Sequence, residues 1–372
     1  MIERVSAKVS EKGNMAMAYT ILTINPGSTS TKIGVYNDAV EFWSEKIIHD
    51  TGELSRFASV NAQYQHRLDK IKEKLRHSGV GLSEFDAFVA RGGLLKPVMG
   101  GTYAINEGML ADLRESRYGT HASNLGALLA QSLAMEMHKP AFIVDPVVVD
   151  ELKPVARITG RPEIKKRSIF HALNQKAIAH RLANQVNRPY EELTLIVAHL
   201  GGGISVGCHN KGRVIEVNNS LDGEGPFSPE RAGTVQAAQF AELLFTLNLD
   251  RERVTKLLAG QGGLVAHLGT NDVREVENRI TAGDDEVKLI YDAMIYQIAR
   301  FIAAAAVPVS GCVDYIAITG GMAHSEYIIK ELTEYISFIA PVKIFPGEDE
   351  LKALAEGALR VLRGDEECRE YI

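Results

Sequence analysis

Two stretches share one plan: an apolar strand, a glycine-rich tip and an alternating strand that ends in Asn. They are TINPGSTSTKIGVYN at residues 23–37 and VAHLGGGISVGCHN at residues 197–210. A hairpin joins antiparallel strands, so a purely parallel sheet is excluded and mixed sheets are expected. One such hairpin at the start of each half suggests duplicated domains that face each other across a cleft. The alternative is that two unrelated hairpins share the same turn chemistry.

The rest of the chain alternates between strand-like and helical segments. Strands are predicted at FDAFVA, AFIVD, RVIEVN, VDYIAIT and VKIF, and helices at about 53–77, 121–138, 233–247, 285–306, 325–338 and 349–363. This alternation favours an α/β architecture in layers. A length of 372 residues makes two domains the expectation. Their boundary is predicted near 146–165, where prolines and a glycine interrupt the pattern.

The composition excludes several classes of protein. A net charge of −6 provides no basic surface for nucleic acid or anionic lipid. No uninterrupted apolar run reaches the roughly 18 residues that a membrane span needs. Residues 1–19 lack the apolar core of a signal peptide and are interpreted as a loose arm. The three cysteines show no CxxC spacing, so neither a disulfide framework nor a zinc site is expected. We therefore expect a cytoplasmic protein with no nucleic acid or membrane partner.

The tip of the first hairpin carries more hydrogen-bonding groups than a turn requires. Gly27, Ser28, Thr29 and Ser30 supply backbone N–H groups and hydroxyls that can converge on a phosphate. Asn25, at the end of the preceding strand, could hold a water or a metal ligand. The stretch is not a Walker loop, because it lacks the second glycine and a strand follows it. An ordinary structural turn is the alternative.

Two further glycine tips also follow apolar strands. Gly201, Gly202 and Gly203 follow LIVAHL, and glycines let a backbone approach a ligand closely. Gly320 and Gly321 lie between the strand YIAIT and a helix that is predicted to begin near 325, a place that suits the sugar and base of a nucleotide. No helix follows the tip of Gly201, Gly202 and Gly203, so that tip does not fit a Rossmann motif. Three such tips together favour a nucleotide cleft.

Three charged residues lie at strand or loop ends. Arg91 in FVARGG and Arg231 in SPERAG could clamp a carboxylate or a transferring phosphoryl group in a bidentate manner. Asp145 ends the apolar strand AFIVD, and the carboxyl edge of a buried strand is where open α/β sheets keep active-site groups. Ordinary surface ion pairs for the arginines and a turn cap for the aspartate are the alternatives.

The histidines and serines give no independent catalytic motif. His121, His171 and His199 each stand beside apolar or small residues, where a histidine more often has a structural role. Their spacing gives no HExxH-type helix, so a protein-bound transition metal is not expected. The sequence contains no GxSxG elbow, which leaves serine-hydrolase chemistry unsupported.

The motifs in their order along the chain resemble the acetate kinase family, with the closest likeness to butyrate kinases. The resemblance covers about residues 20–363 and rests on TINPGSTSTKIGVY, ARGG, YGTHASNLGALLA, FIVDP, IFHALN, VAHLGGGISVG, SPERAG, AITGGMAHSEYI and PGEDELKALAEGALRVL. It implies two duplicated ribonuclease-H-like domains of the actin-like ATPase type around an ATP cleft. The implied domain I comprises residues 20–150 and about 351–372, and domain II comprises residues 151–350.

The resemblance also implies roles for individual residues. It places Asn25 and Glu350 near Mg²⁺, Asp145 beside the reacting groups, and Arg231 on the transferring phosphoryl group. It assigns the second phosphate loop to Gly201, Gly202 and Gly203, with His199 before it, and the adenosine motif to Gly320 and Gly321. His121 has a counterpart in the family as well.

The chain departs from the family at two motifs. Acetate kinases have HRVVHGG where this chain has AFVARGG, so Arg91 aligns with their histidine. They have FHGTSH where this chain has FHALNQ, so His171 matches the first histidine while Gln175 replaces the second, the one tied to catalysis. Substrate contacts are therefore expected to be similar in kind but not in detail.

The expected activity is that of a kinase dependent on Mg²⁺ and ATP that converts butyrate into butyryl phosphate by direct in-line transfer. Isobutyrate, acetate or propionate are the alternative acceptors. An actin-like or chaperone-like ATPase is an alternative of a different class, but it would need long insertions for which this chain has no room. A sugar kinase is a further alternative, but Arg91 and Arg231 favour an anionic acceptor over a sugar. The resemblance implies a homo-oligomer, at least a dimer.

Overall fold

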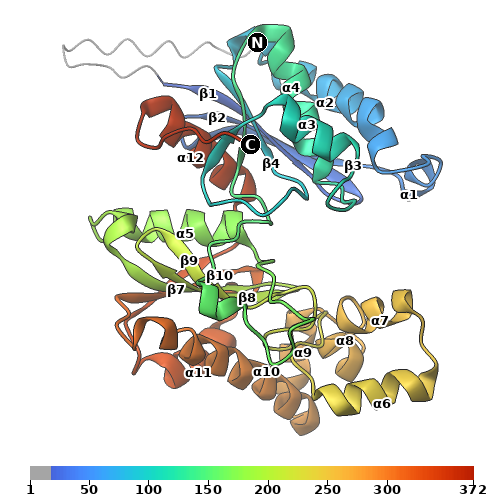
Figure 1. Ribbon diagram of the computed structural model, residues 1–372, viewed down its shortest axis with the longest axis vertical. Coiled ribbons are helices and arrows are strands. Elements are labelled where there is room, and N and C mark those ends of the chain that lie inside the picture. The colour runs from blue at the N-terminus through green and yellow to red at the C-terminus, as the bar shows by residue number, and fades with distance from the viewer. Residues whose placement is uncertain (1–17) are drawn as a thin grey trace.

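The computed structural model describes residues 18–372, and in it two mixed β-sheets lie one above the other with helices on their faces (Figure 1). The α/β prediction with mixed sheets is therefore confirmed. Residues 1–17, most of the predicted N-terminal arm, lie outside the described residues. The exact domain limits at 150 and 350 stay a prediction.

The first sheet has six strands in the order β3-β2-β1-β4-β6-β5. Its strands are β1 (Thr20–Pro26), β2 (Ser30–Asn37), β3 (Val40–Ile48), β4 (Ala87–Arg91), β5 (Thr102–Ala104) and β6 (Ala141–Val144). The first three strands form an antiparallel meander, while β4 pairs in parallel with β1 and β6. The central strands are nearly continuous apolar runs because both faces of the sheet are covered.

Helices cover the two faces of this sheet differently. On one face lie α2 (Tyr64–Ser78), α3 (Glu107–Arg114) and α4 (Asn124–Met137), whose apolar side chains join those of β1, β2 and β4 in one core. On the other face lies α12 (Glu350–Arg363), with part of α5 (Ala172–Gln185). The last long helix of the chain thus packs against its first strands.

The second sheet has five strands in the order β11-β10-β7-β8-β9. They are β7 (Thr194–Leu200), β8 (Ile204–Asn210), β9 (Arg213–Val217), β10 (Tyr315–Gly320) and β11 (Val342–Pro346). One face packs on α5 and the other on α10 (Asp285–Ala304) and α11 (Glu326–Ile336). Since α5 also contacts α12, these two helices form the layer between the sheets (Figure 1).

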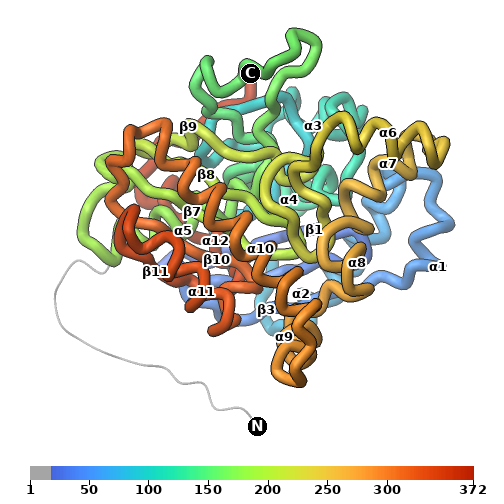
Figure 2. Tube along the Cα trace, turned by 90° about the horizontal axis from the view of Figure 1, so that it is seen from below, coloured from blue at the N-terminus to red at the C-terminus, as the bar shows by residue number. Residues whose placement is uncertain are grey.

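The remaining helices extend from the second sheet. They are α6 (Ala237–Leu247), α7 (Arg251–Leu258), α8 (Gly263–Leu268) and α9 (Val273–Thr281), and Figure 2 shows α6 and α7 on the side away from β11. Short helical turns are α1 (Thr51–Leu54), η1 (Asn61–Gln63), η2 (Leu82–Glu84), η3 (Pro154–Arg157), η4 (Tyr190–Glu192), η5 (Val307–Val309) and η6 (Gly321–His324). The helix α6 is apolar, yet none of its residues is buried.

One helical stretch has the length and composition of a membrane span. Residues 285–309 reach a mean hydropathy of 1.3, and 44% of the scored window is buried within the molecule. Tyr291, Met294 and Ile298 of α10 are fully buried in the core of the second sheet. The expectation that no such segment exists therefore holds only for uninterrupted apolar runs. This helix is buried in the way that core helices are.

Several predicted elements differ in the structure. The single helix expected at 53–77 is interrupted between α1 and η1, because side chains bind the backbone there: Ser55 Oγ donates to Gly52 O, and Asn61 Nδ2 donates to Arg114 O. The strands β3 and β5 and the helices α3, α5, α7, α8 and α9 were not predicted. The helix expected from 233 begins at Ala237.

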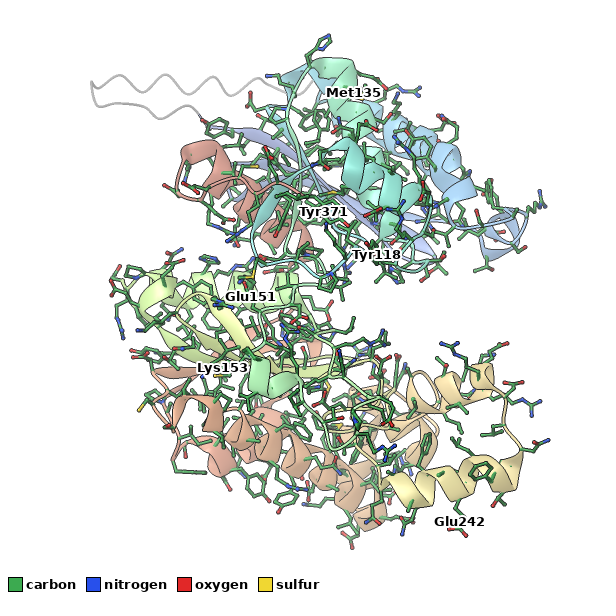
Figure 3. The ribbon with its side chains drawn as sticks, in the orientation of Figure 1. Tyr118, Met135, Glu151, Lys153, Glu242 and Tyr371 are labelled. Atoms are coloured by element: carbon green, nitrogen blue, oxygen red, sulfur yellow. The ribbon has the colours of Figure 1, made fainter. Side chains whose placement is uncertain are left out.

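The linker between the sheets is anchored by a buried carboxylate. Glu151 Oε1 accepts the backbone N–H of Gly100 at 2.9 Å, and Oε2 accepts that of Val214 at 2.7 Å. Lys176 Nζ lies 3.3 Å from Oε2, so the carboxylate joins residues of both sheets. Figure 3 shows Glu151 in the region between the two sheets and Lys153 at the level of the second sheet. These contacts tie the segment before β5 to β9 and α5.

Candidate active site

Five of the residues predicted for the site meet in one small cavity between the sheets. The cavity has a volume of about 20 Å³ and is lined by Arg91, Asp145, Val147, Phe170, His171, Ala172, Leu173, Asn174, His199, Glu348 and Glu350. These residues come from the ends of β4, β6, β7 and β11 and from the N-termini of α5 and α12. The carboxyl ends of strands and the amino ends of helices therefore converge here, as in other open α/β sheets.

Glu350 joins the two ends of the first sheet's parallel strands. Asn25 Nδ2 donates to Glu350 Oε2 at 2.6 Å, and Arg91 Nη1 donates to Glu350 Oε1 at 2.8 Å. Glu350 is the first residue of α12, so a residue more than three hundred positions away completes the site around Asn25. The structure thus brings together the two residues predicted to lie near a metal.

Glu348 and Asn174 support His199 on the opposite side. Asn174 Oδ1 lies 2.8 Å from His199 Nδ1, and Asn174 Nδ2 donates to the carbonyl of Glu348 at 3.1 Å. His199 Nε2 lies 3.5 Å from Glu348 Oε1. This contact, with nearby cationic side chains, lowers the pKa of Glu348 and keeps its carboxylate ionised. Sequence reasoning had identified neither Glu348 nor Asn174.

His171 stacks on His199 in the wall of the cavity. Their ring centroids are 3.8 Å apart, and the ring planes are inclined by 15°. Burial lowers the pKa of His171 well below its usual value, and the charges of Arg231 and Arg91 act in the same direction. His171 is therefore neutral at physiological pH.

Asp145 is buried and held in an unusual backbone conformation. It directly precedes Pro146, and its φ of 36° lies in the left-handed region that few residues other than glycine adopt. Its Oδ1 accepts the N–H of Gly101 at 2.7 Å. Desolvation raises its pKa to about 6, although the charges of Lys176 and Arg360 act in the opposite direction. A strained, poorly solvated carboxylate at a cavity is typical of a functional group.

The first hairpin tip lies beside this cavity but does not line it. The guanidinium of Arg67 donates to the carbonyl oxygens of Gly27, Ser28 and Ser30 at 2.9, 3.0 and 3.3 Å. The carbonyl of Thr29 accepts the N–H of His49. Within residues 18–372, the N–H groups of Ser28 and Thr29 have no partner. The N–H of Gly27 donates to the carbonyl of Ser30, so the free backbone donors are those of Ser28 and Thr29, and anion binding by the tip stays a prediction. Sequence reasoning missed Arg67.

The second hairpin tip packs closely against Arg231. A Cβ added at Gly203 would collide with the guanidinium of Arg231, which donates to the carbonyl of Ser220. Ser228 Oγ donates to the carbonyl of Gly202 at 2.5 Å. Desolvation lowers the pKa of Arg231, which nevertheless stays cationic. The guanidinium therefore lies directly behind the glycine loop, and it lines neither cavity of the site.

A larger cavity adjoins the first. It measures about 700 Å³ and is lined by Gly201, Gly202, Pro229, Glu230, Asn271, Asp272, Val273, Arg274, Glu277, Gly321, Met322, His324, Ser325 and Glu348. Two of the three predicted glycine tips therefore line one cavity of nucleotide size. Gly320, with φ of 93°, packs against the backbone of Leu200, where no side chain would fit.

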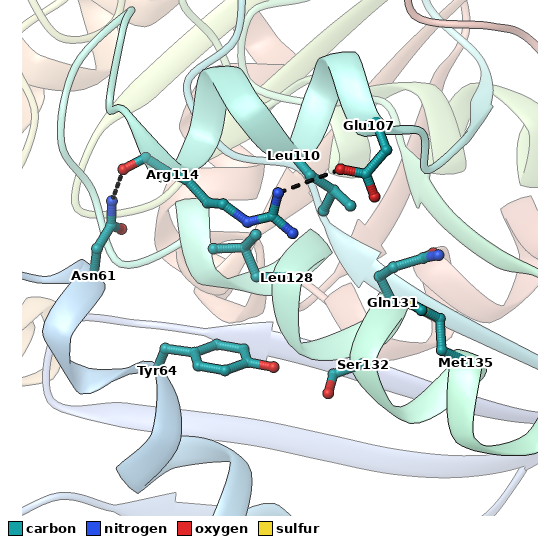
Figure 4. A pocket seen from close by; sticks show the side chains of 9 residues that line it. All are labelled: Asn61, Tyr64, Glu107, Leu110, Arg114, Leu128, Gln131, Ser132 and Met135. Atoms are coloured by element: carbon teal, nitrogen blue, oxygen red, sulfur yellow. Dashed lines mark hydrogen bonds and ion pairs between the residues drawn. The ribbon is translucent and has the colours of Figure 1, made fainter.

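Two features lie apart from these cavities. His121 is exposed and lines neither cavity, and its Nδ1 lies 2.8 Å from Ser123 Oγ. Desolvation and then the charge of Arg91 lower its pKa, so its ring lies near the Arg91 side of the site. A separate groove on the first domain, about 370 Å³ in volume, is lined by residues of η1, α2, α3 and α4, among them Tyr64 and Met135 (Figure 4). It contains none of the predicted site residues.

The residues fit a divalent ion that is carried by a nucleotide. No cluster of three or more His, Cys, Asp or Glu side chains with metal-site geometry occurs in the described part of the chain. Glu348 and Glu350 nevertheless present carboxylates to the cavity. Mg²⁺ usually keeps several waters and binds through one or two carboxylates and the phosphates of a substrate. The donor set matches that mode of binding.

Three comparisons agree with this geometry. The model of the Acetokinase family matches residues 161–340. The fold is similar to that of an acetate kinase from Porphyromonas gingivalis, with a TM-score of 0.75 and 17% identity over 93% of this chain and 100% of that one. A propionate kinase from Francisella tularensis subsp. tularensis SCHU S4 gives a TM-score of 0.74 and 19% identity over 91% and 99% of the chains.

A more distant likeness identifies the wider fold. A ROK family protein from Streptococcus pneumoniae TIGR4 gives a TM-score of 0.53 and 11% identity over 93% of this chain and 100% of that one. The predicted actin-like ATPase fold is therefore confirmed. The family match over residues 161–340 and the kinase folds support the acetokinase family as the one that this chain resembles.

Proposed function

We propose that the protein is a short-chain carboxylate kinase that uses ATP with Mg²⁺ and that butyrate is its acceptor. One observation carries the proposal: Glu348 lines both the large cavity and the small cavity of Arg91 and Asp145. A nucleotide whose base occupies the large cavity would thus place its phosphates toward the small one. The family match supports the same class of reaction.

The proposed reaction is in-line attack of the substrate carboxylate on the γ-phosphoryl group. A carboxylate is already a competent nucleophile, so the protein chiefly orients the reactants and neutralises charge. Arg91 binds the acceptor carboxylate. Arg231 lines neither cavity, but its charge reaches His171 in the wall of the small one, and from there it stabilises the transferring group. Asp145 orients the reacting groups from the buried wall. His171 and His199 provide hydrogen bonds to phosphoryl oxygens.

The bound Mg²⁺ would neutralise phosphate charge when it accompanies the nucleotide. The carboxylates of Glu350 and Glu348 would hold its water ligands. Asn25 and Arg91 orient Glu350, and His199 orients Glu348. The Ser28 and Thr29 N–H groups would bind a phosphate oxygen at the first tip.

The preference for butyrate rests on the apolar part of the small cavity. Val147, Phe170 and Leu173 line it together with Arg91, so one anionic end and one short apolar tail are matched. Each buried CH₂ contributes about 0.8 kcal/mol, which gives butyrate about 1.6 kcal/mol over acetate. This corresponds to a preference of about fifteenfold at equal chemistry. The cavity of about 20 Å³ would have to open when the acid binds.

The test is acyl phosphate formation trapped as hydroxamate, measured with acetate, propionate, butyrate, isobutyrate and valerate. We expect butyrate to have the highest kcat/KM. A higher value for acetate, propionate or isobutyrate would overturn the butyrate assignment and retain the kinase. ATP turnover that is indifferent to every acid would instead indicate an actin-like or chaperone-like ATPase.

We also propose that the protein is a cytoplasmic homo-oligomer, at least a dimer. The helix α6 supports assembly, because it is apolar and exposed: Phe245 keeps 85% of its surface and Leu247 50%. Light scattering after size-exclusion chromatography should give a multiple of 40.7 kDa. A monomer at micromolar concentration would contradict this proposal and leave the proposed reaction untouched.

A further inference from the structure

A buried chain of hydrogen bonds ends at His171. Tyr190 Oη lies 2.7 Å from His209 Nδ1, and His209 Nε2 lies 3.0 Å from Gln175 Oε1. Gln175 Nε2 lies 2.8 Å from Ser205 Oγ, which lies 2.8 Å from His171 Nδ1. Gln175, Ser205 and His209 have no exposed surface. The chain crosses α5 and β8 and reaches the cavity at one point, the ring of His171.

The orientation of Gln175 is fixed by a backbone group. Its Nε2 also lies 3.0 Å from the carbonyl oxygen of Ser205, and a carbonyl can only accept. The amide nitrogen must therefore face Ser205, and the amide oxygen must face His209. Because that oxygen can only accept, His209 Nε2 carries a proton. Burial lowers the pKa of His209 well below its usual value, so the ring is neutral and its Nδ1 accepts from the hydroxyl of Tyr190.

The direction of the next hydrogen bond follows from the acceptors of Ser205. Its Oγ accepts one N–H from Gln175 Nε2 at 2.8 Å and faces the backbone N–H of His171 at 3.5 Å. The first contact uses one lone pair of the hydroxyl, and the second is a long contact at the limit of hydrogen-bond length. Among the described residues, the hydroxyl proton has one acceptor within reach, His171 Nδ1 at 2.8 Å. Nδ1 therefore accepts, and the ring proton lies on Nε2.

We propose that Gln175, through Ser205, is a positioning residue that holds His171 as the neutral Nε2–H tautomer. His171 then presents a hydrogen-bond donor to the cavity, and it does not act as a base. This inference rests on the proposed function, in which a phosphoryl oxygen is the acceptor of that donor. His171 Nε2 forms no hydrogen bond within residues 18–372, so the donor is free for a ligand.

The physical benefit is a donor that is fixed before the ligand arrives. A histidine free to exchange tautomers would spend part of its time with a lone pair toward the phosphate, which repels an anion. A preorganised donor toward developing charge in a buried site contributes about 10² to 10³ in rate. Stacking on His199 holds the plane of the ring, and the hydrogen bond from Ser205 selects the nitrogen that bears the proton.

Gln175→Glu provides the sharpest test, because it keeps the shape and removes the N–H donors. Burial raises the pKa of the new carboxyl, so the variant is measured at a pH high enough to ionise it. The carboxylate would then accept the Ser205 hydroxyl proton, and His171 Nδ1 would have to donate to Ser205 Oγ. We expect the tautomer to switch to Nδ1–H, as observed by ¹⁵N NMR of the ring nitrogens. His171→Gln assigns the signal. We expect kcat to fall about a hundredfold and KM for ATP to change less than threefold.

Two further variants keep the test independent of how well the first one folds. Ser205→Ala should leave His171 as a mixture of tautomers and lower kcat about tenfold. Tyr190→Phe is the matched control, because it shortens the chain at the far end and leaves Gln175 and Ser205 in place. It should keep the Nε2–H signal and kcat within twofold.

A wild-type His171 that carries its proton on Nδ1 would overturn the inference. The same holds if Ser205→Ala, or a folded Gln175→Glu with its carboxyl ionised, keeps the pure Nε2–H signal. The NMR measurement needs no turnover, so the absence of acyl phosphate in the hydroxamate assay would contradict the proposed function alone. An Nε2–H signal with unchanged kcat in both variants would overturn the positioning role.

Discussion

The tips of the β1–β2 and β7–β8 hairpins are held in place by different means. Behind the first tip lies Arg67, a fully buried guanidinium that binds three of the four tip carbonyls. Arg67 also binds Gln63 Oε1 and Thr31 Oγ1, and within residues 18–372 none of its hydrogen-bond partners is a carboxylate. A side chain therefore sets the conformation of the first tip, and its cation stays uncompensated.

The second tip depends on the absence of side chains. Gly203 leaves the space that the guanidinium of Arg231 occupies, and Gly201 lies close to His199 Nε2 and Glu348 Oε1. The carbonyl of Gly202 accepts from Ser228 Oγ at 2.5 Å. Both hairpin tips thus have an arginine behind them. At the first tip the guanidinium binds backbone carbonyls, and at the second tip it packs against a glycine Cα. The glycine should be essential at the second tip and dispensable at the first.

The largest effect is expected for Gly203→Ala. The added Cβ would overlap the guanidinium of Arg231, so this cation would move away from the loop. We expect kcat for acyl phosphate formation to fall up to about a thousandfold. Gly202→Ala is the matched control, because its Cβ would meet the flexible carboxylate of Glu230 at 3.3 Å. Equal rates for both variants would show that the second tip does not need its glycine.

The second test removes the carboxylate of Asp145, which belongs to neither hairpin tip. Asp145→Asn should lower kcat about a hundredfold at pH 8 with little change in ATP binding. Its folded pKa of about 6 exceeds the ordinary 3.8, so the ionised carboxylate weakens the fold. That cost is absent below pH 4, grows as the pH rises to 6 and is complete above it.

The variant should therefore gain stability over the wild type at pH 8, by up to about 3 kcal/mol, and gain nothing near pH 4. Urea denaturation at both pH values measures the difference. An equal gain at both pH values would assign it to packing and not to charge. Unchanged kcat would remove Asp145 from the reaction and leave the two tips as the main catalytic elements.

Arg67→Gln tests the first tip. Several tip carbonyls would lose their donor, and this loss is partly offset because a desolvated cation is removed. We expect a loss of about 2 kcal/mol in unfolding free energy and an increase in KM for ATP below tenfold. The exposed Arg76 in the same helix is the control, and Arg76→Gln should stay within about 0.5 kcal/mol. Equal stability of the two variants would contradict a structural role for Arg67.

The smallest effect is expected for Gly27→Ala. Its Cβ would meet the carbonyl oxygen of Ser30 at 3.4 Å, an ordinary contact, and its φ is not in the left-handed region. Stability should stay within about 0.5 kcal/mol and kcat/KM for ATP within twofold. Thermal unfolding and initial rates measure both. A loss as large as that of Gly203→Ala would remove the contrast between the tips.

Local patterns in the sequence predicted much of the fold. The apolar runs of β1, β4, β7 and β10 and the glycine tips between strands were recognisable, because burial on both faces leaves few polar residues in a strand. The strand β3 was missed because most of its residues are polar or exposed. The break after α1 depends on Asn61 binding α3, a contact that no local pattern contains.

The site was predicted less completely. Strand ends indicated Asn25, Arg91 and Asp145, and the resemblance to the family indicated Glu350, but their meeting point depends on the packing of α12 against the first sheet. Arg67 lies in a helix full of charged residues, and nothing in the sequence distinguishes it from its exposed neighbours. Glu348 lies two positions before Glu350, and this closeness in the sequence could have indicated it as a further site residue.

The return of α12 to the first sheet has a consequence for how the chain folds during synthesis. Ala353, Leu354 and Ala358 complete the core formed by Ile21 and Val89, and Arg369 pairs with Tyr103 through the backbone. The first sheet must therefore wait, with one apolar face uncovered, until residues 350–372 have left the ribosome. The second sheet, which lies within residues 194–346, can close earlier. The first domain to be synthesised is thus the last to complete its fold, and chaperones would bind its uncovered apolar face.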